Sequence, residues 1–482
     1  MAAFAEYTDY DAIGLAELIE SRAVSRREVF EAARDQTARF NPDVNAVVFE
    51  SIEEAEAHLE RGSAKGPLAG VPFLLKASAV YCQGTPTTAA SRFIAPAPAD
   101  HDSHFVTACR DAGLVILGKT NLPEFGLNAT TEPALYGATR NPWDTGLTAG
   151  GSSGGAGAAV ACRMAPVAHG TDGAGSIRIP ASANGVFGFK PTRGLTPCGP
   201  HAGELWSGLA CNHVLTRSVR DSAAVLDVCH GPWPGDPYSA PTPARPFLDQ
   251  AGRPPDRLRI GFSAETPHGT DTHPECVTAV EDAAALCSSL GHEVIEAALP
   301  FDMEAAVAAL RVIWASHVSL TIRSHNALVG RPPDYGTGLE TVTAALANEA
   351  RSYTCTDHAA AVAHVHKVGR DLAAAFELFG VFLSPTMSRP PWPLGTPSMM
   401  SANLDGYLEE LFELCAFTPQ FNMSGQPAMS VPLHWSADGL PVGVQFAARF
   451  GEDAALFRLA GQLETARPWA DRRPGLLDAA AA

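Results

Sequence analysis

Two glycine-rich turns that carry serines are the segments best suited to chemistry. The first, GGSSGG, spans residues 150–155, and the second, GTDGAGS, spans residues 170–176. Glycine adopts backbone angles that other residues resist and lets amide N–H groups approach a ligand closely. Such turns can hold an oxyanion while a serine hydroxyl attacks a carbonyl. The apolar segment AVACRMAPVAHG between them argues against a flexible linker, and a strand–helix junction without chemistry is the competing interpretation.

A lysine between two apolar segments is the next candidate. Lys76 follows VPFLL and precedes ASAV, so we expect its side chain to be desolvated. Burial disfavours the charged form of lysine and lowers its pKa. A neutral lysine is a competent general base. The alternative is an ammonium group that is solvated or paired at the end of a sheet.

Histidine is the more common base beside a serine nucleophile. The chain has 16 histidines, and His169, His201, His213 and His230 lie near the second turn in the sequence. None accompanies a GxSxG nucleophile elbow, because Ser176 stands in GAGSIRI. We therefore interpret these histidines as structural or surface residues.

The composition limits the class of protein. The chain has 482 residues, of which 46% are hydrophobic and 18% charged, enough for a large core. A formal net charge of −18 without a basic run predicts no nucleic-acid partner. The ten cysteines form no pair or cluster with metal-ligand spacing, so we expect free thiols and no metal.

The location of the protein is also predicted from composition. The N-terminal residues lack a basic segment followed by an apolar one, so no signal peptide is expected. No unbroken apolar run is long enough to cross a bilayer, which predicts no membrane association. Together with the free thiols, these features predict a cytoplasmic protein.

Apolar strand patterns alternate with amphipathic helix patterns along the chain. Strands are predicted at 46–50, 66–75, 113–118, 258–263, 292–299, 380–384, 428–432 and 442–450. Helices are predicted at 11–40 (two helices, the second capped by Ser25), 51–62, 102–112, 154–162, 275–291 and most of 303–380, with a break at 330–338. This order predicts an α/β protein with a mixed, largely parallel central sheet covered by helices on both faces.

Taken together, these segments resemble the amidase signature family. The matching segments are GPLAGVPFLLK (66–76), GLVILGKTNLPEFG (113–126), GGSSGGAGAAVA (150–161), GTDGAGSIRIPAS (170–182), GFKPTRG (188–194), NMSGQPAMSVP (422–432) and GLPVGVQFAARFGED (439–453). Three further segments, TRSVRDSAAVLD, PARPFL and ARPWADRRP, are similar to amidases related to 6-aminohexanoate-cyclic-dimer hydrolase. The resemblance implies one amidase signature domain over residues 1–482, with a more variable helical substrate-pocket region at about 300–420.

The resemblance also implies the catalytic residues. It assigns a Ser–cis-Ser–Lys triad with Ser176 as nucleophile, Ser152 as the bridging serine after a cis peptide bond, and Lys76 as the base. An amide would then be hydrolysed through an acyl-serine without a metal or cofactor.

The backbone of the second turn would hold the oxyanion. Its candidate donors are the N–H groups of Gly173, Ala174 and Ser176, with Gly175 as a further candidate. Three side chains are expected in supporting roles: Ser153 in the first turn, Asp172 orienting backbone amides, and Arg178 bracing the nucleophile turn.

Three positions differ from the commonest family pattern. Ala149 and Ala174 replace a usual proline and a usual glycine, and the methyl of Ala174 is tolerable if its backbone angles are negative. Ala77 stands where an acidic residue often follows the lysine. Losing that carboxylate would favour the neutral amine of Lys76 or loosen its placement.

The substrate pocket is the least determined part of the prediction. Trp314, His317 and Tyr407 are candidates for its wall, with core packing as the alternative for each of them. Asn422 and Gln426 are candidates for its floor.

The predicted partner is a small or medium amide, and a homodimer is compatible with the sequence. An acyl transferase or amide-forming enzyme using the same acyl-serine is the main alternative to a hydrolase. A glutamine-hydrolysing amidotransferase subunit is a further alternative, although the chain lacks a basic surface run. A non-catalytic binding protein is disfavoured, because all three triad residues are present.

Overall fold

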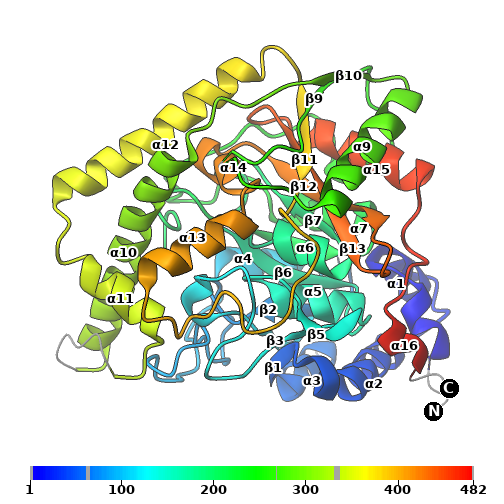
Figure 1. The fold of residues 1–482 in the computed structure, drawn as a ribbon. Coiled ribbons are helices and arrows are strands. Elements are labelled where there is room, and N and C mark those ends of the chain that lie inside the picture. Colours follow the sequence, from blue (N-terminus) through cyan, green and yellow to red (C-terminus); the bar gives the residue numbers. More distant parts are fainter. Residues whose placement is uncertain (1–3, 61–65, 268, 331–336, 480–482) are drawn as a thin grey trace.

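A computed structural model describes residues 4–60, 66–267, 269–330 and 337–479 of the chain. Short apolar segments form one eleven-stranded sheet that runs through the molecule (Figure 1). Its strands are β1 (Val47–Glu50), β2 (Pro72–Lys76), β3 (Val115–Thr120), β6 (Val167–Asp172), β7 (Phe187–Lys190), β8 (Cys211–Thr216), β9 (Arg259–Phe262), β10 (Glu293–Glu296), β11 (Val381–Pro385), β12 (Ala428–Trp435) and β13 (Pro441–Ala448). A separate hairpin joins β4 (Arg140–Asn141) and β5 (Asp144–Thr148).

The sheet is mixed, as predicted. Its strand order is β1-β3-β2-β6-β8-β7-β12-β13-β11-β9-β10. Pairing is parallel in β3-β2-β6 and in β11-β9-β10. It is antiparallel between β1 and β3 and from β6 through β8, β7, β12 and β13 to β11. Antiparallel pairs outnumber parallel ones. The prediction of a largely parallel sheet therefore holds only for β3-β2-β6 and β11-β9-β10, the two blocks on either side of the antiparallel centre. The short connection from β12 to β13 allows only an antiparallel pair.

Helices cover the sheet. They are α1 (Ala12–Glu20), α2 (Arg26–Val44), α3 (Ile52–Glu60), α4 (His104–Asp111), α5 (Gly154–Ala161), α6 (Arg178–Asn184), α7 (Val219–Cys229), α8 (Phe247–Ala251), α9 (Pro274–Ser289), α15 (Asp453–Ala466) and α16 (Gly475–Ala479). Ser25 caps α2 as predicted, since its hydroxyl accepts from the Glu28 amide at 3.2 Å. The final two residues of the predicted helix 51–62 lie outside the described residues.

Both faces of the sheet are covered, as the sequence predicts. A Cβ atom placed on Gly188 of β7 would lie 2.5 Å from the Ala181 side chain of α6. The next residue, Phe189, stacks on Phe457 of α15 with ring centroids 4.3 Å apart. Since successive residues of a strand point to opposite faces, α6 and α15 lie on opposite sides of the sheet.

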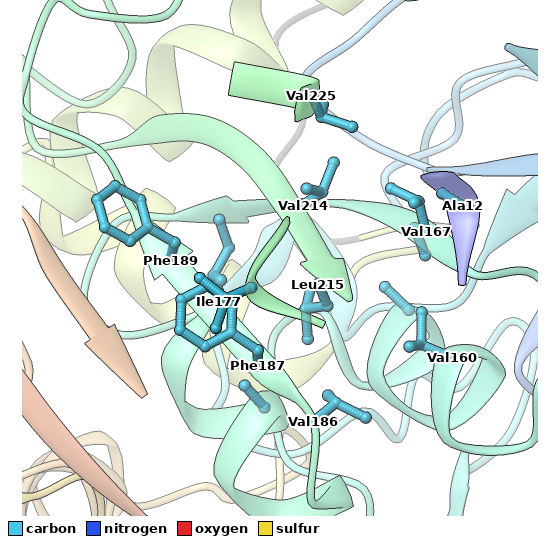
Figure 2. Close-up of a cluster of buried hydrophobic side chains, with 14 of the residues drawn as sticks. Ala12, Val160, Val167, Ile177, Val186, Phe187, Phe189, Val214, Leu215 and Val225 are labelled. Carbon is cyan, nitrogen blue, oxygen red and sulfur yellow. The ribbon is translucent and has the colours of Figure 1, made fainter. Parts of the chain in front are cut away.

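The core around the serine turns follows the same alternation. In Figure 2, Val214 of β8 points toward Val225 of α7, and Leu215 points to the other face, toward Ile177. All four side chains are fully buried. Helix α5 consists only of glycine, alanine and one valine. A Cβ atom on Gly155 would lie 2.4 Å from the backbone nitrogen of Asn121. Its small residues let the backbone pack closely on its neighbours.

A second packing unit is helical. It contains α10 (Met303–Leu328), α11 (Thr341–Glu349), α12 (Cys355–Ala375) and α13 (Leu404–Leu414), which lie on one side of the molecule, away from the two termini (Figure 1). Their buried residues form a hydrophobic cluster separate from the main one of the sheet. The short α14 (Pro419–Ser424) follows. The region is helical as predicted, while most of the predicted break at 330–338 lies outside the described residues.

Helix α10 is unusually apolar. An 18-residue window within it has a mean hydropathy of 1.5, which by length and composition is enough to cross a membrane. In the sequence, Arg311 and several polar residues interrupt its apolar run, so no membrane span is predicted there. In the fold, 44% of the window is buried, and the helix packs against α11 and α12. The buried residues of α10 belong to the hydrophobic cluster of the helical unit.

Candidate active site

The Lys76 side chain lies at the centre of the candidate site. Strand β2 carries it between the parallel neighbours β3 and β6, and all five residues of β2 are buried. The Lys76 Nζ donates to Ser152 Oγ at 2.7 Å and to Ser153 Oγ at 2.9 Å. A third bond of 2.9 Å reaches Thr171 Oγ1. Thr171 is not among the predicted site residues, although its position within the second glycine-rich turn is a signal that could have identified it.

The electrostatics of Lys76 follow from its burial. The side chain is fully inaccessible to solvent. Desolvation lowers the pKa of the Lys76 amine to about 7, while the nearby Asp172 carboxylate acts in the opposite direction. Near neutral pH, a large fraction of this amine is therefore unprotonated and able to accept a proton.

The first serine turn is held by contacts with residues 130 and 131. The Gly151–Ser152 peptide bond is cis, as the family resemblance implies. A Cβ atom on Gly151 would lie 2.4 Å from the Thr130 carbonyl oxygen, so only glycine fits there. The Thr131 hydroxyl donates to the Gly150 carbonyl at 2.9 Å. These contacts fix the turn that presents Ser152 to the Lys76 amine.

Ser153 connects the two turns. Its amide donates to the Ser176 carbonyl at 3.2 Å, and its hydroxyl contacts the Thr171 backbone at 3.3 Å. Ser153 is predicted to support the first turn, whereas these hydrogen bonds and the one from Lys76 Nζ link it to the second turn and to the lysine. Through this residue the turn that carries Ser176 lies directly against the turn that carries Ser152.

The second turn is organised by a buried ion pair. Asp172 and Arg178 are both fully buried, and the guanidinium binds the carboxylate through Nε at 2.9 Å and Nη2 at 2.8 Å. Burial raises the pKa of Asp172, but the Arg178 charge outweighs it and holds that pKa well below its usual range. The carboxylate also accepts from the amides of Gly175 at 2.8 Å and Ile177 at 3.2 Å. These are the bracing contacts expected of Asp172 and Arg178.

The amide donors of the second turn divide into two groups. The Gly175 N–H donates to Asp172 Oδ1 at 2.8 Å, so its inclusion among the oxyanion donors is wrong. Within the part of the chain that the structure describes, no hydrogen bond occupies the amides of Gly173, Ala174 and Ser176. Ala174 does not adopt a left-handed backbone, so its methyl causes no backbone strain.

The two other departures from the family pattern also have structural accounts. Ala77 is buried beside Ala90 and Leu122, in a small apolar cluster. An acidic side chain there would be desolvated, and the three hydroxyls already fix the Lys76 amine without it. Ala149 is fully buried, and its carbonyl accepts from the Asn184 side chain at 2.7 Å.

Ser176 lies in the wall of a small apolar cavity of about 30 Å³. The residues that line it are Gly126, Leu127, Asn128, Ala129, Gly151, Ala174, Ser176, Ile179, Trp206, Trp314, Leu411, Phe412 and Cys415. Trp314, a candidate for the wall, is among these residues and also belongs to the hydrophobic cluster of the helical unit. Trp206 was missed, because nothing in its local sequence marks it as a neighbour of the second turn.

The other four pocket candidates lie outside this lining. The Tyr407 hydroxyl donates to the Leu127 carbonyl at 2.6 Å, and His317 contacts Ser207 at 3.0 Å. Asn422 donates to Asp172 at 2.9 Å, beneath the turn. Gln426 donates to the Ala448 carbonyl at 2.9 Å. For Tyr407 and His317 these contacts fit the alternative of structural packing, and Asn422 and Gln426 are not among the residues that line this cavity.

Two of the four nearby histidines, His169 and His213, have structural roles that agree with the prediction. His169 is fully buried, and its Nε2 lies 3.2 Å from the Asn212 side-chain oxygen. Burial lowers the pKa of His169 to about 3, so its ring stays neutral at working pH. His213 is likewise buried, with its Nε2 2.9 Å from Ser222 Oγ and a pKa lowered to about 3.

Comparison with known proteins defines the class. The Amidase family profile matches residues 28–457, and the chain belongs to this family. It is an amidase, a hydrolase that acts on carbon–nitrogen bonds other than peptide bonds, which agrees with the prediction from the serine turns and the lysine.

Individual relatives cover almost the whole chain. The 6-aminohexanoate-cyclic-dimer hydrolase of Paenarthrobacter ureafaciens is 40% identical over 97% of each chain. The acylamidase of Rhodococcus erythropolis is 35% identical over 95% of this chain and 96% of its own. A structure of 6-aminohexanoate cyclic dimer hydrolase complexed with substrate superposes with a TM-score of 0.92 at 39% identity, covering 98% of this chain and 99% of the other. The predicted resemblance to this subgroup is confirmed.

Proposed function

We propose that this amidase cleaves its amide through an acyl-serine intermediate on Ser176. Neutral Lys76 removes the proton of Ser152, and Ser152 in turn removes that of Ser176. The Ser176 oxygen then forms a bond to the amide carbonyl carbon. The negative charge on the carbonyl oxygen is held by the free amides of the second turn.

The second half of the reaction uses the same groups in reverse. When the carbon–nitrogen bond breaks, Ser152 donates a proton to the leaving nitrogen and recovers one from Lys76. Water then attacks the acyl-serine, giving up its proton along the same path and releasing a carboxylic acid and free Ser176. All atoms come from the amide and one water molecule, and no cofactor enters the balance.

One observation carries this proposal: a fully buried amine, with a pKa of about 7, lies 2.7 Å from Ser152 Oγ. A purely structural lysine would be expected to pair with a carboxylate. Here the three polar partners of the Lys76 amine are all hydroxyls, which provide a path for a proton and no fixed charge. The relatives' activity toward a cyclic amide dimer supports a small-molecule amide as the substrate.

A serine-directed fluorophosphonate tests the nucleophile directly. We expect intact-mass analysis to show one added probe on the wild type, with peptide mapping placing it at Ser176, and no addition to Ser176→Ala. Ser289→Ala is a matched control, because that exposed hydroxyl only bonds the Leu286 carbonyl at the end of α9. Labelling of the Ser176→Ala protein, or amide turnover by it at a level close to wild type, would contradict the proposal.

A further inference from the structure

The segment before β8 forms a turn with an unusual backbone. Leu205 and Ala210 form an isolated antiparallel bridge that closes the turn. Within it, Trp206, Ser207 and Gly208 have φ angles of 52°, 53° and 79°. Left-handed backbone is unfavourable for residues with a Cβ atom, and a bulky residue there is an outlier. Such conformations persist only where surrounding contacts impose them, and they concentrate at functional sites.

The sheet brings this turn to the candidate site. Strands β6 and β8 are antiparallel, with Cys211 opposite Asp172. Residues that precede Cys211 therefore lie beside residues that follow Asp172. A Cβ atom on Gly173 would lie 3.0 Å and 3.1 Å from ring carbons Cε3 and Cζ3 of Trp206. The indole thus covers the backbone that presents the free amides.

The other side of the indole belongs to the cavity wall. Trp206 and Trp314 lie with ring centroids 5.8 Å apart at an interplanar angle of 56°. Trp314 in turn stacks on Phe412, at 5.5 Å and 12°. All three rings line the cavity whose wall contains Ser176. They form a continuous aromatic wall from the second turn to α10 and α13.

Several contacts hold the turn in its conformation. The Ser207 hydroxyl lies 3.0 Å from Nε2 of His317 on α10. The Gly208 carbonyl accepts from Arg193 Nε at 2.5 Å, and the Leu209 carbonyl accepts from the Asn422 side chain at 3.1 Å. Both the helical unit and the base of the site therefore fix the position of Trp206.

The charge of the cavity limits what it can bind. Among its lining residues, none carries a charge, and Asn128 has the longest polar side chain. Burial raises the pKa of the Cys415 thiol to about 12, so this group is neutral as well. A charged group placed here would lose its hydration without gaining a counter-charge.

We propose that Trp206 is a specificity-determining residue, which selects amides whose acyl group is uncharged and apolar and favours aryl over short alkyl groups. This inference rests on the proposed acyl-serine at Ser176. The acyl group stays attached to Ser176 through both steps, whereas the amine must leave after the first. The wall beside Ser176 therefore contacts the acyl group, and an aromatic ring gains edge-to-face contacts there that a methyl group does not.

The test is a set of anilides that share aniline as leaving group and differ in the acyl group: acetyl, hexanoyl, benzoyl and the charged glutaryl. For the wild type we expect kcat/KM to be higher for hexanoyl and benzoyl than for acetyl, and lowest for glutaryl. Trp206→Leu should lower kcat/KM for benzoyl roughly 2- to 13-fold more than for acetyl, mainly through KM. Trp206→Phe should keep most of the preference, and it also serves if the leucine variant does not fold.

Trp233→Leu is a matched control, since Trp233 is a half-buried tryptophan that stacks on His104 with centroids 4.4 Å apart, outside the cavity. Its acyl preference should equal that of the wild type. An equal loss for all acyl groups in the Trp206 variants would overturn the inference, as would failure of the wild type to cleave any neutral anilide. A second series of acetyl amides with different amines completes the test: a Trp206-dependent preference that follows the amine would refute the acyl assignment.

Labelling separates this inference from the proposed function. The fluorophosphonate should still modify Ser176 in every Trp206 variant. If Ser176 is labelled but the preference does not change, only the inference on Trp206 fails. If Ser176 is not labelled in the wild type, the acyl-serine itself fails.

Discussion

The pH dependence of kcat/KM tests the role of Lys76 most directly. With a pKa of about 7, the amine is half neutral at pH 7. The neutral fraction is then about 9% at pH 6 and about 1% at pH 5. Because only the neutral amine accepts a proton, activity should rise with pH through about 7 and reach a plateau above pH 8. Below pH 6, log kcat/KM should have a slope of one.

The assay is amine release from a neutral amide between pH 5 and pH 9, in buffers of constant ionic strength. A neutral substrate is needed so that only the free enzyme titrates. Circular dichroism at each pH checks that the protein stays folded. A profile that remains flat down to pH 5, or one whose midpoint lies above pH 9.5, would refute a buried neutral lysine as the base.

Other groups with a pKa in this range must be separated from Lys76. Burial raises the pKa of Glu340 to about 7 and lowers that of Lys119 to about 8. Glu340 is the more relevant of the two, because its backbone amide donates to the Glu124 carboxylate. Glu124 lies two residues before Gly126, which lines the cavity. We expect Glu340→Gln and Lys119→Met to keep the midpoint near 7. A shift of the midpoint in either variant would reassign the titration.

Two further predictions concern the second turn. Gly173→Ala places a methyl group against the Trp206 ring, so we expect a large loss of kcat, which Trp206→Leu in the same chain should partly restore. A double-mutant cycle of the wild type, the two single variants and the double variant should give a coupling free energy of about 0.5–3 kcal/mol. Strict additivity of the two substitutions would contradict the contact. Asp172→Asn leaves the Arg178 charge buried without its partner, so we expect the free energy of unfolding in urea to fall by about 3–5 kcal/mol. Retention of wild-type stability by this variant would show that the ion pair does not brace the turn.

Local patterns predict the chemistry of this chain well. Lys76 is recognisable because a charged residue stands between the apolar segments VPFLL and ASAV, which predicts a desolvated side chain. The serine turns are recognisable by their glycines, and the structure places Ser152 and Ser153 against the Lys76 amine. These features depend on residues close in sequence, within segments whose conformation is strongly constrained.

Long-range contacts account for most of the site features that the sequence does not predict. Trp206 reaches Gly173 only because β8 returns antiparallel beside β6, a pairing that no local pattern specifies. Asn422 was placed in the pocket floor, but it lies beneath the Asp172 carboxylate. Gly175 is predicted as an oxyanion donor, but its backbone amide donates to the Asp172 side chain. Only the folded turn brings that side chain into place, so no local pattern reveals the contact.

The separation of the two hydrophobic clusters has a consequence for how such enzymes diversify. The proton relay is anchored in the sheet, whereas Trp314 and Phe412 belong to the helical unit. Substitutions on α10 and α13 can therefore reshape the cavity while leaving the groups that break the bond in place. A lineage built on this plan can exchange one amide substrate for another through a few changes in a single layer, without reinventing its chemistry.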